Sequence, residues 1–158
     1  MKNNAFTLIE AMIATILIAL AIAALVTAGG SFTKANSAGI ELSTAEFLIE
    51  QIRELTALLP VIDPNTETAT FGPEEAALAD YDDLDDFDTA SFSPPINADR
   101  QVLSDFVAFR QQIEVENLNA SNFEQVVANH SSNFVRVTVK IFLNSRQIAS
   151  ASWIRAQY

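Results

Sequence analysis

Carboxylates form the densest cluster of chemically active side chains in this sequence. Eight acids and no base lie between Glu74 and Asp88, and they are closest together in the run Asp80-Tyr-Asp-Asp-Leu-Asp-Asp-Phe-Asp88. Hard cations such as calcium prefer clustered carboxylate and carbonyl oxygens. The run therefore supplies five candidate calcium ligands, which are Asp82, Asp83, Asp85, Asp86 and Asp88.

A second interpretation of this run is an acidic loop that is solvated or binds a partner. The run is not an EF-hand, because it has no glycine at the turn and no bidentate glutamate at its end. Tyr81, Leu84 and Phe87 recur every three residues within it. A purely solvated, disordered tract would not need these apolar residues, so we expect them to pin the loop to the sheet.

The sequence contains few candidate catalytic nucleophiles and bases, which argues against an enzyme. The chain has no cysteine, which excludes disulfides, thiolate metal sites and a cysteine nucleophile. Its one histidine, His130, lies in the polar stretch 129–133 and is predicted to be a surface residue in a turn. The sequence contains no G-x-S-x-G elbow, H-E-x-x-H motif or phosphate-binding loop. We expect a protein that is not an enzyme and requires no cofactor, with calcium as its candidate ion.

The charge balance limits the class of partner. The 158 residues include 20 acids against 9 bases, a formal net charge of −11. Nucleic-acid binding is not expected, because no excess of Lys and Arg is available to neutralise phosphates. The length is enough for one domain plus an anchor.

Residues 6–28 form an apolar segment with one carboxylate near its front. A helix of this length spans about 34 Å, enough to cross the hydrocarbon core of a bilayer. An acid such as Glu10 costs about 2.5–3.5 kcal/mol near the membrane centre, and such residues usually have a partner. A cut between Ala5 and Phe6 would create an α-amino group about one helical turn from Glu10. In a stack of such helices, that amino group can pair with Glu10 of a neighbour.

The stretch Phe6-Thr-Leu-Ile-Glu10 at the head of this uncharged run resembles the N-terminus of type IV pilins and type II secretion pseudopilins. The resemblance implies that a prepilin peptidase removes the leader, Met1 to Ala5, and methylates Phe6, and that Glu10 sets the register of the filament. The family nearly always has glycine before the cut, where this chain has Ala5. The implied partners are other pilin or pseudopilin subunits, the prepilin peptidase, an inner-membrane assembly platform and, before assembly, membrane lipid.

The same resemblance implies a single pass through the inner membrane, with the globular part on the periplasmic side. The chain would then enter a pilus or pseudopilus and is most similar to a minor subunit. Two other interpretations of residues 6–28 stay open: a secretory signal peptide cut near Val26-Thr-Ala28, and a plain single-span anchor. The chain would then be a membrane-anchored or secreted module whose acidic loop binds calcium or a basic partner.

Residues 29–59 are predicted to continue the helix as an amphipathic half. Apolar residues recur there at three- and four-residue steps, with glutamates on the other side: Ile40, Phe47, Leu48, Ile52, Leu55 and Leu59 against Glu46, Glu50 and Glu54. Gly29 and Gly30 each weaken the helix by about 1 kcal/mol relative to alanine and are candidate sites for a kink or a melted turn. Pro60 and Pro64 are predicted to end the helix.

Residues 101–158 are predicted to form an antiparallel sheet of three to four strands. The residues 134–143 alternate strictly between apolar and other side chains. A returning strand is expected over 147–155 and an earlier strand over 107–115. Between these strands, 122–127 is predicted to be a short helix or turn.

The two faces of the returning strand follow from alternation. A turn is expected at Asn144-Ser145. Beyond it, Ile148 and Ile154 are predicted to lie on one face and Trp153 on the other.

Together these elements predict an α+β fold. A long N-terminal helix, half in the membrane and half amphipathic, packs on a small antiparallel sheet, which agrees with the pilin-like shape that the resemblance implies. Residues 29–158 form the globular domain. The predicted segments are the leader 1–5, the transmembrane or filament-core helix 6–28, the amphipathic continuation 29–59, the acidic proline-containing loop 60–100 and the sheet 101–158.

Overall fold

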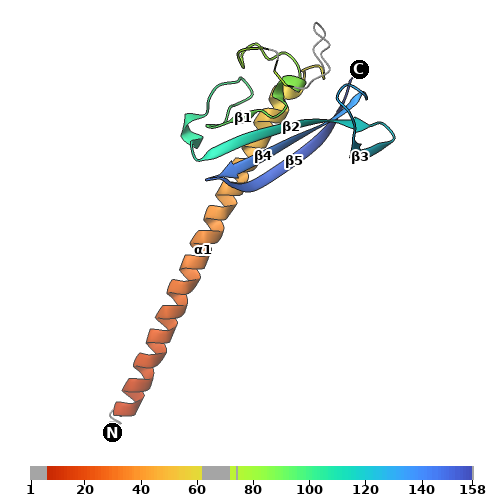
Figure 1. Ribbon diagram of the computed structural model, residues 1–158. Helices are drawn as coiled ribbons and strands as arrows, with labels where there is room; N and C mark the ends of the chain where they lie inside the picture. Colours follow the sequence, from red (N-terminus) through yellow and green to blue (C-terminus); the bar gives the residue numbers. More distant parts are fainter. Residues whose placement is uncertain (1–6, 62–71, 74, 158) are drawn as a thin grey trace. The chain divides into compact units, whose positions relative to one another are not determined.

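The computed structural model describes residues 7–61, 72, 73 and 75–157, and it contains one long helix and an antiparallel sheet (Figure 1). The α+β class and the helix-on-sheet arrangement are confirmed, but the sheet has five strands rather than three or four. The elements in chain order are α1 (Leu8–Thr56), η1 (Asp85–Phe87), β1 (Ser91–Phe92), η2 (Ser104–Phe106), β2 (Phe109–Asn119), β3 (Asn122–Val126), β4 (Phe134–Leu143) and β5 (Arg146–Ala156).

The chain divides into two compact units, Met1–Glu41 and Leu42–Tyr158. In the first unit, α1 runs without interruption through Gly29 and Gly30, so no melted turn forms at these glycines. Alanine, leucine and isoleucine dominate the preceding residues, and their helix propensity outweighs the local cost of two glycines.

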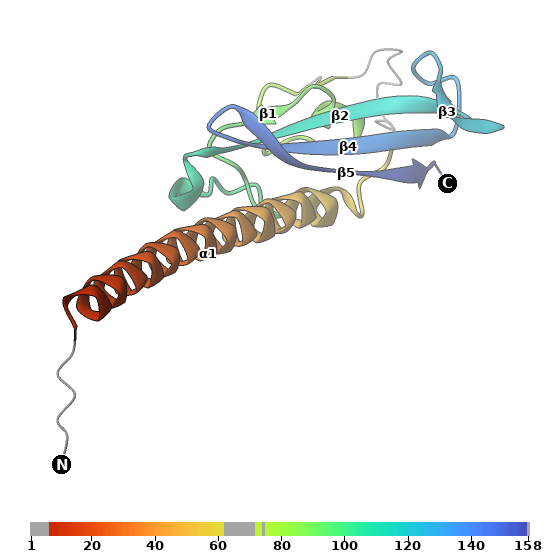
Figure 2. The same ribbon diagram turned by 90° about the horizontal axis from the view of Figure 1, so that it is seen from below.

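In the second unit, the C-terminal part of α1 lies beside the sheet (Figure 2) and buries one face. Leu48 and Ile52 are fully buried in one core with Ile113 of β2 and with Val137 and Val139 of β4. Glu46, Glu50 and Glu54 are exposed, as amphipathic periodicity predicts. The predicted apolar face therefore packs on the sheet, except for Ile40 and Phe47, which stay exposed.

The helix ends at Thr56, earlier than the predicted end near Leu59. The guanidinium of Arg155, on β5, donates hydrogen bonds to the carbonyl oxygens of Thr56 at 2.6 Å and Leu59 at 3.1 Å. Carbonyls in the last turn of a helix have no partner within the helix, and a cation there also interacts favourably with the helix dipole. Pro60 then prevents continuation.

The sheet has the strand order β1-β2-β4-β5, with β3 paired to the far end of β2, and all its pairs are antiparallel. Ile113 lies opposite Val139 and Val137 opposite Trp153. The strict alternation predicted for 134–143 is confirmed by β4, whose residues alternate between buried and partly buried. The turn at Asn144-Ser145 is also confirmed, and both residues have positive φ (47° and 69°), as a two-residue hairpin of type I′ requires.

Trp153 and Ile154 lie on opposite faces of β5, as predicted, but Ile148 packs against the core with Trp153 instead of sharing the face of Ile154. Ile141 pairs with Ala149 and Phe142 with Gln147, so Ile148 is an extra residue in a β-bulge. A bulge shifts the alternation of the strand beyond it. Trp153 therefore packs against the core and Ile154 is 44% exposed.

The segment predicted as a short helix or turn over 122–127 is instead the strand β3. The side-chain oxygen of Asn119 accepts hydrogen bonds from the backbone N–H and the hydroxyl of Ser121, at 2.9 Å and 2.8 Å. This local turn reverses the chain, so that β3 pairs back onto the end of β2, with Leu118 opposite Val126. β2 accordingly runs to Asn119, beyond the predicted end at Val115.

Gln111 is a buried polar residue that the sequence analysis did not identify. It is fully buried, and its amide nitrogen donates to the carbonyl oxygens of Leu48 on α1 at 2.9 Å and Ile96 at 3.1 Å. Its amide oxygen accepts the N–H of Ile96 at 2.8 Å. One side chain thus joins the helix, β2 and the loop before β2, and both polar groups of Ile96 depend on it.

We expect Gln111→Leu to lower the free energy of unfolding by about 1–3 kcal/mol, because it leaves buried backbone groups of Ile96 without partners. Chemical denaturation of the full chain in detergent measures this loss. Gln112→Leu is the matched control, since neighbouring residues of a strand face opposite sides and Gln112 is only partly buried. Equal losses in the two variants would contradict the assignment.

Candidate functional site

The first candidate site is the apolar N-terminal part of α1. From Thr7 to Ile40 every residue is exposed except Ala14, which is partly buried. The helix is long and apolar enough to span a membrane. Soluble proteins rarely expose a contiguous apolar surface of this extent. The large apolar side chains exposed along the segment include Leu8, Ile9, Met12, Ile13, Ile16, Leu17, Ile18, Leu20, Ile22, Leu25 and Val26.

Hydroxyl groups in this segment are satisfied by the helix itself. Thr15 donates to the carbonyl oxygen of Met12 at 2.8 Å, and Thr27 donates to that of Ala23 at 2.9 Å. Such bonds from side chain to backbone leave no hydroxyl hydrogen in need of water. Residues 8–28 of this helix therefore suit an apolar environment in every respect except the charge of Glu10.

Glu10 forms a capping box with Thr7 at the start of α1. Its Oε2 accepts hydrogen bonds from the N–H of Thr7 at 2.8 Å and from the Thr7 hydroxyl at 2.7 Å, and the N–H of Glu10 donates to that hydroxyl at 3.3 Å. The pattern Thr-x-x-Glu before an apolar run is the sequence signature of this cap, and the sequence analysis missed it. Glu10 thus has a structural role within its own chain, whereas Ala5 and Phe6 lie outside the described residues.

The second candidate site is the acidic loop, which three apolar residues hold in place. Leu84 and Phe87 are fully buried in the core, and the Tyr81 ring packs edge-on against Phe87 with centroids 5.2 Å apart. The expectation that these residues pin the loop is confirmed. Arg100 adds hydrogen bonds to the carbonyl oxygens of Leu78, at 3.2 Å, and Ala79, at 2.6 Å.

Carboxylates also shape the loop from within. The N–H groups of Asp82 and Asp83 donate to Oδ2 of Asp86, at 2.9 Å and 3.4 Å, and the N–H of Asp86 donates back to Oδ1 of Asp83 at 3.1 Å. Asp83 and Asp86 are fully buried. These reciprocal bonds hold the turn that carries η1 and fix the direction of both carboxylates.

Three of the acids converge. Single carboxylate oxygens of Glu75, Asp82 and Asp86 all lie within 4.8 Å of one another. Glu75 was absent from the predicted ligands, because it lies seven positions before Asp82 and only the folded loop brings the two together. Among the described residues, Oε2 of Glu75, Oδ2 of Asp83 and Oδ1 of Asp86 are buried without a hydrogen-bond partner.

Two carboxyl groups of this loop have raised pKa values, so they ionise less readily than ordinary carboxyl groups. A hydrogen bond with the Asp86 carboxyl raises the pKa of Glu75 to about 7. Burial, followed by contact with the Asp85 carboxyl, raises the pKa of Asp83 to about 8. Carboxyl groups that share a site cannot all be charged unless a proton or a cation neutralises part of the charge.

The remaining predicted ligands contact other groups. Oδ2 of Asp85 lies 3.2 Å from Nε2 of His130, and Oδ1 of Asp88 accepts the N–H of Val115 on β2 at 2.9 Å. His130 lies in a turn, as predicted, but it is partly buried and its side chain is only 15% exposed. The loop before β4 thus brings the His130 ring within hydrogen-bond distance of the buried Asp85 carboxyl in η1.

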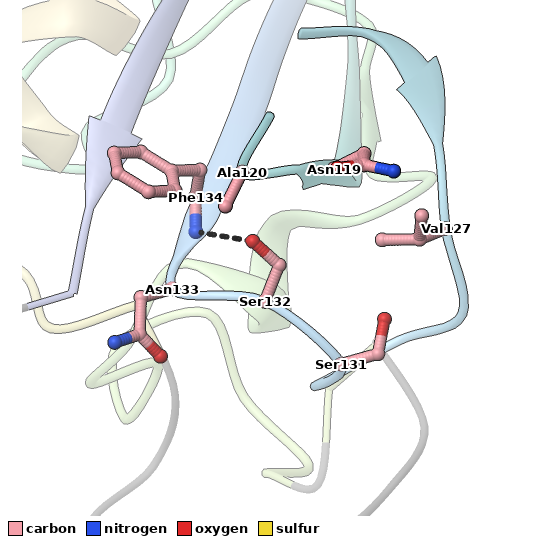
Figure 3. Close-up of a pocket in the computed structure, with 7 residues that line it drawn as sticks. All are labelled: Asn119, Ala120, Val127, Ser131, Ser132, Asn133 and Phe134. Atoms are coloured by element: carbon pink, nitrogen blue, oxygen red, sulfur yellow. Dashed lines mark hydrogen bonds between the residues drawn. The ribbon is translucent and has the colours of Figure 1, made fainter. Parts of the chain in front are cut away.

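An open pocket of about 330 Å³ lies between the β2–β3 turn and the loop before β4 (Figure 3). The Ser132 hydroxyl in it accepts the N–H of Phe134 at 3.2 Å. None of its lining side chains titrates near neutral pH, so the pocket offers no acid–base catalysis. The lining residues are Asn119, Ala120, Val127, Ser131, Ser132, Asn133 and Phe134.

Comparison of the chain with protein-family models, with curated proteins and with solved structures finds no match in any of the three.

Proposed function

We propose that this chain is a structural subunit, most similar to a minor one, of a type IV pilus or a type II secretion pseudopilus. The proposal is based on one observation: the uninterrupted helix α1, which begins at Leu8, exposes an apolar N-terminal segment in which Glu10 is the single carboxylate before Glu41. In this proposal a prepilin peptidase cuts between Ala5 and Phe6 and methylates Phe6. The subunit waits in the inner membrane, with residues 29–158 on the periplasmic side, until an assembly platform adds it to the filament.

The exposed apolar side chains support a segment that lies first in lipid and later among neighbouring helices. Lipid covers these side chains before assembly, and neighbouring helices cover them afterwards. Lipid and leucine are equally apolar, so helix association in such a setting depends on close packing. Small residues allow the backbones to approach, and the segment is rich in them: Ala11, Ala14, Ala19, Ala21, Ala23 and Ala24.

The negative charge of Glu10 supports the proposal that Glu10 pairs with a cationic group. The two bonds from Thr7 satisfy the carboxylate as an acceptor, but neutral donors leave its net charge in place. Once the leader with Lys2 is removed, the next base is Lys34, about 36 Å along the helix. The α-amino group of Phe6, in the same or a neighbouring subunit, is the cation within reach. At an effective dielectric of 20, such a pair 4 Å apart gains about 4 kcal/mol, so it favours one register of neighbouring helices.

A second candidate function is a membrane-anchored or secreted binding module. The observation that favours it is the convergence of Glu75, Asp82 and Asp86 in a loop fixed to the core. In this case residues 6–28 would serve only as an anchor or a signal peptide, and Glu10 would act only as a helix cap.

The mature N-terminus distinguishes the two functions. Mass spectrometry of the native protein is expected to show a chain that begins at N-methylated Phe6. A chain that begins at Met1 leaves Glu10 without the new amino group, and one that begins near Gly29 indicates secretion. Either result contradicts the filament proposal.

Variants of Glu10 separate its charge from its cap. Glu10→Gln removes the charge but keeps the capping box, because glutamine also occupies that position of the motif. Glu10→Ala removes both. We expect each variant to lower the assembled fraction at least about tenfold, the equivalent of about 1.4 kcal/mol. The assay compares the sheared filament fraction with the membrane fraction.

The matched control is Glu54→Gln, which removes an exposed charge from the same helix outside the apolar segment and is expected to assemble normally. Limited proteolysis of residues 29–158 should be unchanged in all three variants. Normal assembly of Glu10→Gln together with failure of Glu10→Ala would show that Glu10 acts through the helix cap, and the charge pairing would have to be abandoned.

A further inference from the structure

We propose that Glu75, Asp82 and Asp86 bind a calcium ion, with Asp83 holding Asp86 in position. This site lies in the second unit of the chain, and the inference does not depend on the filament proposal. The proposed ligands differ from those expected from the sequence. Glu75 is added, whereas Asp85 contacts His130 and Asp88 accepts the N–H of Val115.

The distances between the three carboxylate oxygens support calcium binding. Calcium binds oxygen ligands at about 2.3–2.6 Å, so two ligands on opposite sides of one ion lie at most about 4.6–5.2 Å apart. The carboxylate oxygens of Glu75, Asp82 and Asp86 all lie within 4.8 Å of one another. This spacing is compatible with one calcium ion shared by all three carboxylates.

Burial of Asp86 distinguishes this site from a solvated acidic patch. Asp86 is fully buried, and its Oδ2 already accepts the N–H groups of Asp82 and Asp83. Its Oδ1 and Oε2 of Glu75 are buried, and no N–H or hydroxyl group of the described residues donates to either oxygen. A buried polar atom without a partner usually indicates an ion or water that completes the site. Two such oxygens on converging carboxylates favour a cation, because water does not neutralise their charge.

The position of Asp86 is set before any ion binds. Its backbone N–H donates to Oδ1 of Asp83, and the neighbouring Phe87 is anchored in the core. Glu75, in contrast, lies ten positions before the start of η1. An ion bound by both would tie this earlier part of the acidic loop to the turn that packs on the sheet, so ion binding should stabilise the folded domain.

The donor set selects calcium among common cations. All three ligands are oxygens, whereas zinc prefers nitrogen and sulfur. Magnesium demands a near-ideal octahedron, but calcium accepts six to eight oxygens in irregular geometry, with waters filling the remaining positions. Calcium modules outside the cytoplasm work at about 0.1–1 mM, which is compatible with a site of three carboxylates.

The test is calorimetric titration of CaCl₂ into the full chain in detergent after treatment with a chelator. We expect saturable binding with a Kd below about 1 mM. At a calcium concentration about ten times the Kd, the Tm should rise by about 5 °C. Titration with MgCl₂ at the same ionic strength should give much weaker binding. Absence of saturable heat and of a Tm shift, or equal responses to both ions, would overturn the proposal.

Variants locate the site. Glu75→Gln and Asp86→Asn should each weaken calcium binding at least about tenfold, because each removes one of three ligand charges. Glu75→Gln leaves the backbone bonds of the turn intact, so it remains informative if Asp86→Asn fails to fold. Asp80→Asn is the matched control, an exposed acid of the same loop outside the cluster, and should bind as the parent does. Equal weakening by Asp80→Asn, or normal binding by Glu75→Gln, would show diffuse acidity instead of a site.

Discussion

Burial of one face of α1 against the sheet is the constraint on which the second unit depends. Leu48 and Ile52 share a core with Val137 and Val139, and this apolar contact is strong but non-directional. Polar groups must therefore fix how the helix lies on the strands. Gln111 does so on β2 by bonding to Leu48 and Ile96. Arg155 does so on β5, where it binds the carbonyls at the end of the helix.

Negative charge on carboxylates that are held by hydrogen bonds links the two candidate sites. Glu10 stands at the head of an apolar helix, and its partners in the described chain are the neutral groups of Thr7. Asp86 is buried within a group of converging carboxylates. In both places hydrogen bonds orient the carboxylate but do not remove its charge, and a cation does. An amino group and a calcium ion are the proposed cations.

The structural features that could be predicted are those set by residue patterns within short segments of the sequence. The alternation of residues 134–143 predicted β4 because side chains on a strand alternate with a period of two. The spacing of Tyr81, Leu84 and Phe87 predicted an anchored loop, which burial confirms. Errors occurred where pairing intervened: the bulge at Ile148 reversed the faces of β5 beyond it. Glu75 was not predicted as a calcium ligand because the acids that lie near it in the fold are not adjacent to it in the sequence.

The sequence by itself determined the elements, namely a long apolar helix with one acid at its head, an amphipathic continuation and alternating strands, since length and periodicity are properties of short segments. Only the tertiary structure decided which carboxylates converge, which polar side chains are buried and which acid His130 meets. Asp85 and His130 are 45 positions apart, and their contact depends on the register of the sheet and on the burial of η1. Such contacts arise from the packing of many residues at once, so no single segment of the chain specifies them.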